Sequence, residues 1–218
     1  PLVLGIGGNC TEHVICEIKQ QTPILTQHFC AILSVCPYYN KPNQQGMFQH
    51  FYAIAEASPL PIILYNVPGR TGVNLLPETV ERLYKAIPEK IIGVKEASGK
   101  LEQIKRLLEI MPEEFMVISG DDKYACELME AGAKGLISVA SNAFPEDFHT
   151  IIYEKDAALA EKYKQLVHLL FAEGSPAGIK CVLAEKGLIS NTLRLPLVPC
   201  TPLLQQEIHE ELAVISHP

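Results

Sequence analysis

Lys95 is the residue in this sequence with the clearest chemical potential. It ends a continuous apolar stretch, Ile91-Ile92-Gly93-Val94. A lysine held among apolar side chains loses hydration, which disfavours its ammonium form and lowers the pKa of the amine. A neutral amine is the nucleophile that a Schiff base with a carbonyl compound requires. The alternative is an ordinary lysine that is solvated or paired with Glu96, and Lys95 taken alone favours this alternative, because most lysines are surface groups.

Three neighbouring segments supply companions for such an amine. Tyr65 ends another apolar run, and a phenol near an imine can relay protons as a general acid and base. Arg70 follows in a loop rich in Pro and Gly and offers a planar fork suited to a carboxylate. Tyr38 and Tyr39 end a third run, and two adjacent tyrosines cannot both face the same way, so we expect one at the site and the other at an interface. Each residue has a structural explanation by itself, but together they describe a Schiff-base site for a keto acid.

Short apolar runs that precede these residues recur at the spacing of βα units, about 20 to 31 residues. Because the runs are continuous rather than alternating, they predict parallel strands that are covered on both faces. Amphipathic patterns between them predict helices. The expected strands are Leu2–Ile6, Ala31–Val35, Ile62–Tyr65, Ile91–Lys95, Phe115–Ser119 and Gly135–Val139. The expected helices between them are Met47–Ala57, Leu76–Ala86, Leu101–Met111 and Asp122–Ala131.

Consecutive βα units predict either a doubly wound sheet or a (β/α)8 barrel. The doubly wound sheet needs a nucleotide fingerprint after its first strand. Gly5-Ile6-Gly7-Gly8-Asn9-Cys10 lies there, but Cys10 replaces the third glycine of G-x-G-x-x-G. The barrel is therefore favoured, and in a barrel the catalytic groups lie at the C-terminal ends of the strands, where Tyr65 and Lys95 are found.

From residue 145 onward the pattern is helical only. We therefore expect an α/β fold: a TIM-barrel catalytic domain over residues 1–145, with six of the eight βα units of such a barrel, and a C-terminal helical domain over 146–218. The helices expected in the second domain are Pro145–Tyr153, Ala157–Phe171, Pro176–Lys186 and Pro202–Ile215.

The composition of the 218 residues is that of an ordinary globular protein, with 48% hydrophobic residues. The formal charge of −7 argues against a broad nucleic-acid surface, and no apolar run approaches the ~18–20 residues of a membrane helix. The seven cysteines form no C-x-x-C pair and the histidines form no H-E-x-x-H motif. We expect reduced, mostly buried thiols, no metal, no nucleic-acid or membrane partner, and a cytoplasmic location.

Four motifs, together with a segment near the end of the chain, resemble the dihydrodipicolinate synthase / N-acetylneuraminate lyase family, and in particular its dihydrodipicolinate synthases. The resemblance implies a (β/α)8 barrel with a C-terminal helical domain. It also implies a class I aldolase-type lyase that condenses pyruvate with L-aspartate 4-semialdehyde to 4-hydroxy-tetrahydrodipicolinate in lysine (diaminopimelate) biosynthesis. No cofactor is implied beyond the covalent imine between the lysine and pyruvate. The matching segments are Tyr38-Tyr39-Asn40-Lys41-Pro42, Tyr65-Asn66-Val67-Pro68-Gly69-Arg70-Thr71-Gly72, Gly93-Val94-Lys95-Glu96-Ala97-Ser98-Gly99, Ser119-Gly120-Asp121-Asp122 and Leu193-Arg194-Leu195-Pro196-Leu197-Val198-Pro199.

The same resemblance implies a role for each candidate residue. Lys95 would form the imine with pyruvate, and Tyr65 would donate and accept the proton at that imine. Tyr39 would complete a hydroxyl relay across a tight dimer interface of a homotetramer, a dimer of dimers. Arg70 would hold the carboxylate of the semialdehyde. Main-chain groups of two further residues would line the pocket, namely Gly120 and Ile137.

The sequence departs from the family pattern in three places. The Thr-Thr-Gly-Glu segment that supplies a relay threonine is absent, so we expect the parent protein to be longer by about two βα units. The segment Glu12–Gln27 fits the family's usual helix poorly, because Pro23 interrupts it and it is longer than expected. Asn9 and Tyr38 match a lysine-effector site of some members, whereas His13 stands where an acidic residue is often found, so lysine inhibition stays open.

Two alternatives compete with this interpretation. The first is N-acetylneuraminate lyase or a related pyruvate-dependent keto-acid aldolase, which shares the lysine and the tyrosine but handles polyols. Arg70 discriminates, because its carboxylate fork suits the semialdehyde. The second is an inactive barrel scaffold, which should have lost Lys95, Tyr65 or Arg70, and all three are present.

Overall fold

The computed structural model describes residues 1–216. The chain divides into two compact units: the first comprises residues 1–120 and 131–135, and the second comprises residues 121–130 and those from 136 onward. The division into domains at residue 145 stays a prediction.

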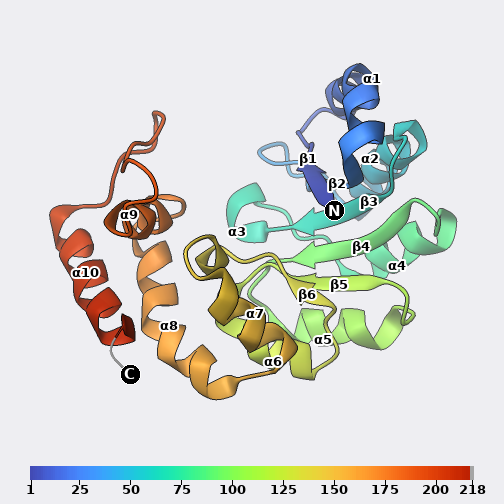
Figure 1. The fold of residues 1–218 in the computed structure, drawn as a ribbon. Coiled ribbons are helices and arrows are strands. Elements are labelled where there is room, and N and C mark those ends of the chain that lie inside the picture. The colour runs from blue at the N-terminus through green and yellow to red at the C-terminus, as the bar shows by residue number, and fades with distance from the viewer. Residues whose placement is uncertain (217–218) are drawn as a thin grey trace. The chain divides into compact units, whose positions relative to one another are not determined.

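The first unit is built on a curled, six-stranded sheet whose strands follow one another in chain order (Figure 1). The strands β1 to β5 pair in parallel. A doubly wound sheet would reverse its strand order at a switch point, and this sheet does not. The predicted fold class, six βα units of a TIM-type barrel followed by C-terminal helices, is confirmed. The strands are β1 (Leu2–Gly5), β2 (Phe29–Val35), β3 (Ile62–Asn66), β4 (Ile91–Glu96), β5 (Met116–Ser119) and β6 (Gly135–Leu136).

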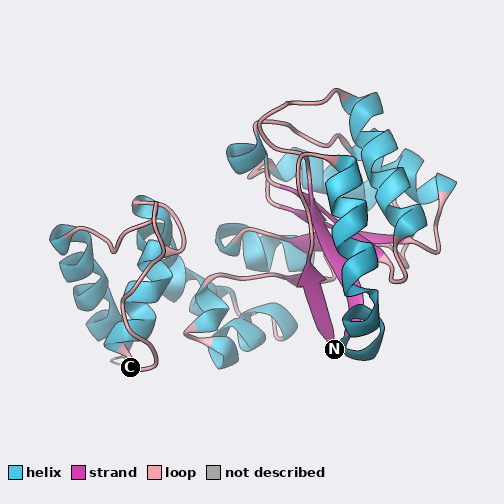
Figure 2. Ribbon diagram, turned by 90° about the horizontal axis from the view of Figure 1, so that it is seen from above, coloured by secondary structure: helices cyan, strands magenta, loops and turns pink. Residues whose placement is uncertain are grey.

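Helices cover one face of this sheet, and apolar side chains hold the two layers together. The strand register aligns Leu64, Val94 and Val117 on one face, and all three are buried. Figure 2 shows α1 running alongside the strands. The apolar positions that recur at helical spacing are the ones that become buried, as Val80 and Leu83 do. The helices of this unit are α1 (Thr11–His28), α2 (Gln44–Ala57), α3 (Pro68–Thr71), α4 (Pro77–Ala86) and α5 (Leu101–Ile110).

The expectation that Pro23 interrupts the helix after β1 is wrong. α1 runs without a break from Thr11 to His28, with Pro23 inside it. Proline removes one backbone donor from a helix. On either side of it, hydroxyls bond to carbonyls of the preceding turn: Thr22 Oγ1 donates to the oxygen of Ile18 at 3.0 Å, and Thr26 Oγ1 donates to the oxygen of Thr22 at 3.1 Å. The buried residues Val14, Ile18 and Leu25 then hold both halves of the helix on the sheet.

The last predicted strand is much shorter than expected. It covers only Gly135–Leu136, not Gly135–Val139. The buried carboxylate of Asp122 accepts the backbone N–H of Val139 at 2.9 Å and of Ala140 at 3.4 Å, so these groups bond to a side chain instead of a strand partner. The predicted helix Asp122–Ala131 likewise begins as a 3-10 turn, η1 (Asp122–Tyr124), before α6 (Ala125–Glu130).

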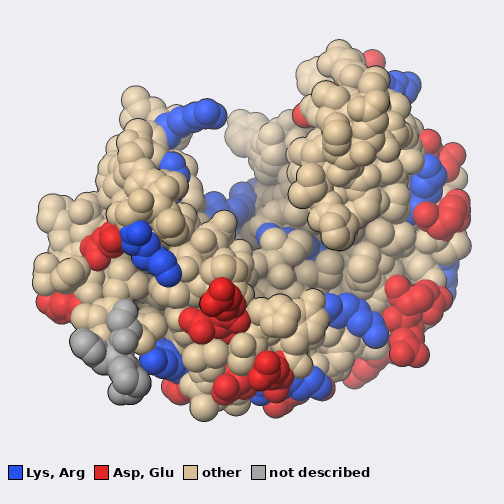
Figure 3. Space-filling view, in the orientation of Figure 1, with Lys and Arg blue, Asp and Glu red and all other residues tan. Residues whose placement is uncertain are grey.

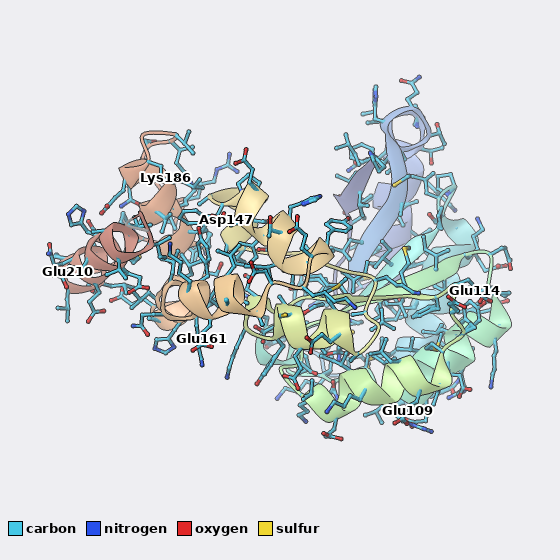
Figure 4. All side chains as sticks on the ribbon, turned by 60° about the horizontal axis from the view of Figure 1, so that its bottom comes forward. Glu109, Glu114, Asp147, Glu161, Lys186 and Glu210 are labelled. Carbon is cyan, nitrogen blue, oxygen red and sulfur yellow. The ribbon has the colours of Figure 1, made fainter. Side chains whose placement is uncertain are left out.

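The second unit is helical, as the sequence predicts. A buried aromatic cluster lies in its core, where the ring of Tyr163 meets Phe144 and Phe148 edge-on. The Tyr163 hydroxyl donates a hydrogen bond to Asp147 on α7, which is labelled in Figure 4. Lys186, just after α9, places its Nζ 4.1 Å from the centroid of the Phe144 ring. The helices from residue 145 onward are α7 (Pro145–Tyr153), α8 (Ala157–Ala172), α9 (Ala177–Glu185) and α10 (Pro202–Ser216).

Charged side chains of both signs are interspersed on the lower right face in Figure 3, where α4 and α5 lie in Figure 1. Lys85 and Glu81 pair one turn apart at 2.6 Å, and Arg106 reaches both Glu78 and Glu109 at 3.4 Å. Such exposed pairs contribute little to stability. Within residues 1–216 no single helix has the length and hydropathy of a membrane span, although α8 and α9 pass that test as a pair bent by 120°.

The expectation of mostly buried thiols is only partly correct. All seven cysteines are unpaired thiols, but Cys10, Cys16 and Cys30 are exposed.

Candidate active site

The structure brings Tyr65 and Lys95 together at the C-terminal ends of two adjacent strands. Tyr65 of β3 and Lys95 of β4 are register partners, so their side chains leave the sheet on the same face. The Lys95 Nζ lies 4.1 Å from the centroid of the Tyr65 ring. Both residues are half-buried. Burial raises the pKa of the Tyr65 hydroxyl, which therefore keeps its proton at neutral pH and can donate it.

Gly120 packs against the Lys95 side chain from the next strand end. A Cβ atom added at Gly120 would lie 3.0 Å from the Lys95 Cε and 2.7 Å from the Ala97 Cβ. The Gly120 N–H donates to the oxygen of Glu96 at 2.8 Å, which holds the glycine in this place. A side chain at this position would displace Lys95, so glycine provides the space in which the amine stands.

Arg70 lies in the short helix α3, directly after β3. The turn is fixed by Thr71, whose Oγ1 donates to the oxygens of Val67 and Val73, and by Gly72, whose φ of 75° favours glycine. The guanidinium of Arg70 lowers the pKa of Tyr65 and partly offsets the effect of burial. Arg70 is exposed, so its positive charge acts on the Tyr65 phenol from the side that faces solvent.

Tyr38 and Tyr39 lie in the loop after β2 and are both exposed. Tyr39 is 87% exposed and has a φ of 74°, a conformation that non-glycine residues rarely adopt. The Asn40 Nδ2 donates to the oxygen of Asn9 at 2.9 Å, so the loops after β1 and β2 are joined. The candidate effector residues Asn9 and Tyr38 thus belong to neighbouring loops.

Ile137 belongs to the second unit, where it follows β6 and is 37% exposed. Its proposed contribution to the pocket stays a prediction. The residue that shapes its loop, Asp122, received no role from the sequence, although it is part of the Ser119-Gly120-Asp121-Asp122 motif. Burial raises the pKa of Asp122, while bonds from Ser138 and from the N–H groups of Val139 and Ala140 lower it. Two adjacent acids at a strand end are the signal that could have indicated a buried carboxylate.

Glu96 is the second residue that the sequence left without a function. Successive strand residues face opposite sides, so Glu96 points away from Lys95, into the layer between sheet and helices. It is 1% exposed and accepts hydrogen bonds from the side chains of Asn66 and Gln103. An acid inside an apolar strand was the available signal. In the part of the chain that the structure describes, no group of three or more His, Cys, Asp or Glu side chains could hold a metal ion.

Comparisons with known proteins agree with this fold. The model of the dihydrodipicolinate synthetase family matches residues 1–215. A 4-hydroxy-tetrahydrodipicolinate synthase of Parabacteroides distasonis is 45% identical over 223 residues, which cover 99% of this chain and 74% of that protein. The structure of dihydrodipicolinate synthase from Thermotoga maritima superposes with a TM-score of 0.91 at 37% identity, covering 99% of this chain and 75% of that one. The pyruvate complex of the chloride-inhibited enzyme from Acinetobacter baumannii gives 0.91 at 40% identity, with coverage of 99% and 75%. A match of this extent in sequence and in fold places the chain in the dihydrodipicolinate synthetase family.

Proposed function

We propose that the protein is a Schiff-base-forming lyase that condenses pyruvate with L-aspartate 4-semialdehyde to 4-hydroxy-tetrahydrodipicolinate, a step of lysine (diaminopimelate) biosynthesis. The observation that carries the proposal is the position of the Lys95 Nζ, 4.1 Å from the centre of the Tyr65 ring. The relatives that match nearly all of this chain carry the name of that activity.

The residues on the first unit divide the chemistry between them. The Lys95 amine attacks the keto carbon of pyruvate and one water leaves, which gives the imine. Loss of a proton from the pyruvate methyl group gives an enamine, whose carbon attacks the aldehyde of the semialdehyde. Tyr65 exchanges protons with the reacting atoms, since its raised pKa keeps the hydroxyl protonated. The amino group of the second substrate then displaces Lys95 and closes the ring, which regenerates the free amine. No cofactor is needed for these steps.

Arg70 favours this reaction over that of a sister lyase. The positive charge of its guanidinium lowers the pKa of Tyr65. The planar guanidinium can also bind a carboxylate through two hydrogen bonds. The hydroxyl groups of a polyol substrate do not require a guanidinium at this position. An inactive scaffold would not require Lys95, Tyr65 and Gly120 to lie together.

The exposure of Tyr39 supports a role across a subunit interface. A tyrosine that is 87% exposed on a conformationally strained loop offers its hydroxyl to a second copy of the chain, as a homotetramer built from dimers would require. The joined loops of Asn9 and Tyr38 support a lysine-effector site beside it. A cytoplasmic location fits the unpaired state of the cysteines.

Trapping of the imine tests the proposal. The full-length protein is mixed with pyruvate and borohydride, and mass spectrometry of its peptides should find the reduced adduct on Lys95. A coupled assay should show turnover with aspartate semialdehyde and none with N-acetylneuraminate. Lys100→Ala, which removes an exposed lysine nearby, is the matched control and should keep the adduct. An adduct on another lysine would contradict the proposal. So would turnover of N-acetylneuraminate without turnover of aspartate semialdehyde.

A further inference from the structure

We propose that Glu96 is a positioning residue that aligns Lys95 with Tyr65 from the opposite face of the sheet. It does so through a buried network made of the side chains of Glu96, Asn66, Asn74 and Gln103, called here the Glu96 network. The proposal deepens the proposed function and rests on it, since the aligned pair is the imine-forming pair.

The Glu96 carboxylate is held by several donors in the interior. Asn66 Nδ2 lies 2.9 Å from Oε2 and 3.2 Å from Oε1, and Gln103 Nε2 lies 2.9 Å from Oε2. The backbone N–H of Ser98 donates to Oε1 at 2.7 Å. Glu96 is 1% exposed and Asn66 is fully buried. Hydrogen bonds to an ionised acceptor are short and strong, and these fix the carboxylate in one orientation.

The strand register transmits this orientation to the catalytic face. Asn66 and Glu96 are register partners, and each directly follows one member of the Tyr65–Lys95 pair. Because neighbouring strand residues face opposite sides, a bond between Asn66 and Glu96 on one face fixes the backbones that carry Tyr65 and Lys95 on the other. The bond from Ser98 to Glu96 fixes the turn that leaves β4 as well.

The network also reaches the loop that carries Arg70. Asn66 Oδ1 accepts the backbone N–H of Leu75 at 2.9 Å, and Asn66 Nδ2 donates to Asn74 Oδ1 at 2.9 Å. Asn74 Nδ2 in turn donates to Gln103 Oε1 at 2.7 Å. Asn74 and Leu75 close the far end of the loop that begins after Asn66. One buried cluster therefore fixes both ends of the Arg70 loop and the strand ends of Tyr65 and Lys95.

The negative charge of Glu96 also acts at the end of β2, on the far side of β3. Burial first, and the charge of Glu96 second, raise the pKa of the Cys36 thiol. Stability alone does not explain a buried charged group, since well-packed apolar residues of similar volume stabilise a protein interior at least as well. Hydrogen bonds, in contrast, are directional, and direction is what two side chains on adjacent strands need.

Three variants of the full-length protein separate positioning from stability. Glu96→Gln keeps the shape but replaces an acceptor with a donor that faces Asn66 or Gln103. Glu96→Gln combined with Gln103→Glu exchanges carboxylate and amide across their 2.9 Å contact and restores a donor–acceptor pair. Gln103→Met, at a half-buried position, removes the donor to Glu96 and the acceptor of Asn74 Nδ2 but keeps the Glu96 carboxylate. Glu102→Gln, an exposed acid on the same helix, is the matched control.

The rate at which borohydride traps pyruvate on Lys95, measured per folded protein, is the main readout. We expect Glu96→Gln to slow it about 10- to 100-fold, since displacement of a reacting group by about 1 Å can cost that much. Gln103→Met should slow trapping several-fold, the double exchange should recover much of the loss, and Glu102→Gln should have no effect.

Crystal structures of Gln103→Met and of the double exchange provide a second readout. The Nζ of Lys95 should be displaced from the Tyr65 ring in the first and returned to it in the second. Unchanged trapping with a lowered melting temperature, or an undisplaced Nζ in Gln103→Met, would overturn the positioning role. Absence of a Lys95 adduct from the unaltered protein would instead contradict the proposed function, so the two failures are distinguishable.

Discussion

At the scale of single residues, the environment of Tyr65 explains how one phenol can serve an imine. Burial raises its pKa and Arg70 lowers it, so the hydroxyl stays protonated while a positive charge lies near enough to stabilise developing negative charge. The two effects come from different directions: the protein interior on one side and the exposed α3 loop on the other. Arg70 therefore acts on Tyr65 in addition to its proposed role of binding a carboxylate.

Arg70→Ala should separate binding of the second substrate from formation of the imine. We expect kcat/KM for aspartate semialdehyde to fall about 100-fold, because a bidentate contact to a carboxylate is lost. Borohydride trapping of pyruvate should fall only a few-fold. Steady-state kinetics and adduct mass measure the two effects, and Arg106→Ala, an exposed arginine of α5, is the control. Equal losses in both measurements would contradict the assignment of Arg70 to the semialdehyde.

At the scale of elements, helix α1 shows that a proline in the sequence does not always mark the end of a helix. Its Pro23 predicts a break, but Ile18 and Leu25 are buried on either side of Pro23 and the helix is continuous. The helix is also joined to α2 by a hydrogen bond of 2.8 Å between Thr11 Oγ1 and His50 Nδ1. His50 is only 5% exposed, and burial lowers its pKa from 6.5 to about 4.

This lowered pKa predicts a loss of stability in acid. The unfolded chain takes up the His50 proton near pH 6.5 and the folded protein only near pH 4, so the stabilising contribution is complete above pH 6.5 and is lost as the pH falls to about 4. The shift corresponds to about 3 kcal/mol in the free energy of unfolding. Urea denaturation across this range should show a steeper fall for the unaltered protein than for His50→Gln.

His13→Gln, which replaces an exposed histidine of α1, is the control for that experiment. Its curve should follow that of the unaltered protein. If His50→Gln and the unaltered protein lose stability in parallel between pH 6.5 and pH 4, burial of a neutral His50 does not contribute as described.

At the scale of the whole molecule, the exposed Tyr39 connects the site to assembly. Its hydroxyl can serve catalysis only if another surface covers it, and a second copy of the chain is the proposed cover. Symmetric dimers place the same residue of each subunit at the other's site, which makes the arrangement testable by mixing subunits.

Lys95→Ala and Tyr39→Phe should each be nearly inactive alone and should complement each other when mixed. In a mixed dimer one site combines an intact Lys95 with an intact Tyr39, so random exchange should restore about one quarter of the activity. Coupled assays after subunit exchange measure this recovery, and native mass spectrometry should find tetramers. No recovery in mixed dimers would show that Tyr39 acts within its own subunit or not at all.

The sequence by itself determined the order of the strands and which residues stand close to their C-terminal ends, except at β6. Continuous apolar runs and helical periodicities are local patterns, so the βα order, the C-terminal helices and the proximity of Lys95 to Tyr65 could be predicted. Tertiary structure decided the length of β6, the continuity of α1 and the Glu96 network. The Glu96 network, for example, depends on polar groups that meet across 30 residues of the chain, as Asn66 and Glu96 do. Such meetings follow from strand register and side-chain direction, which no local pattern in the sequence specifies.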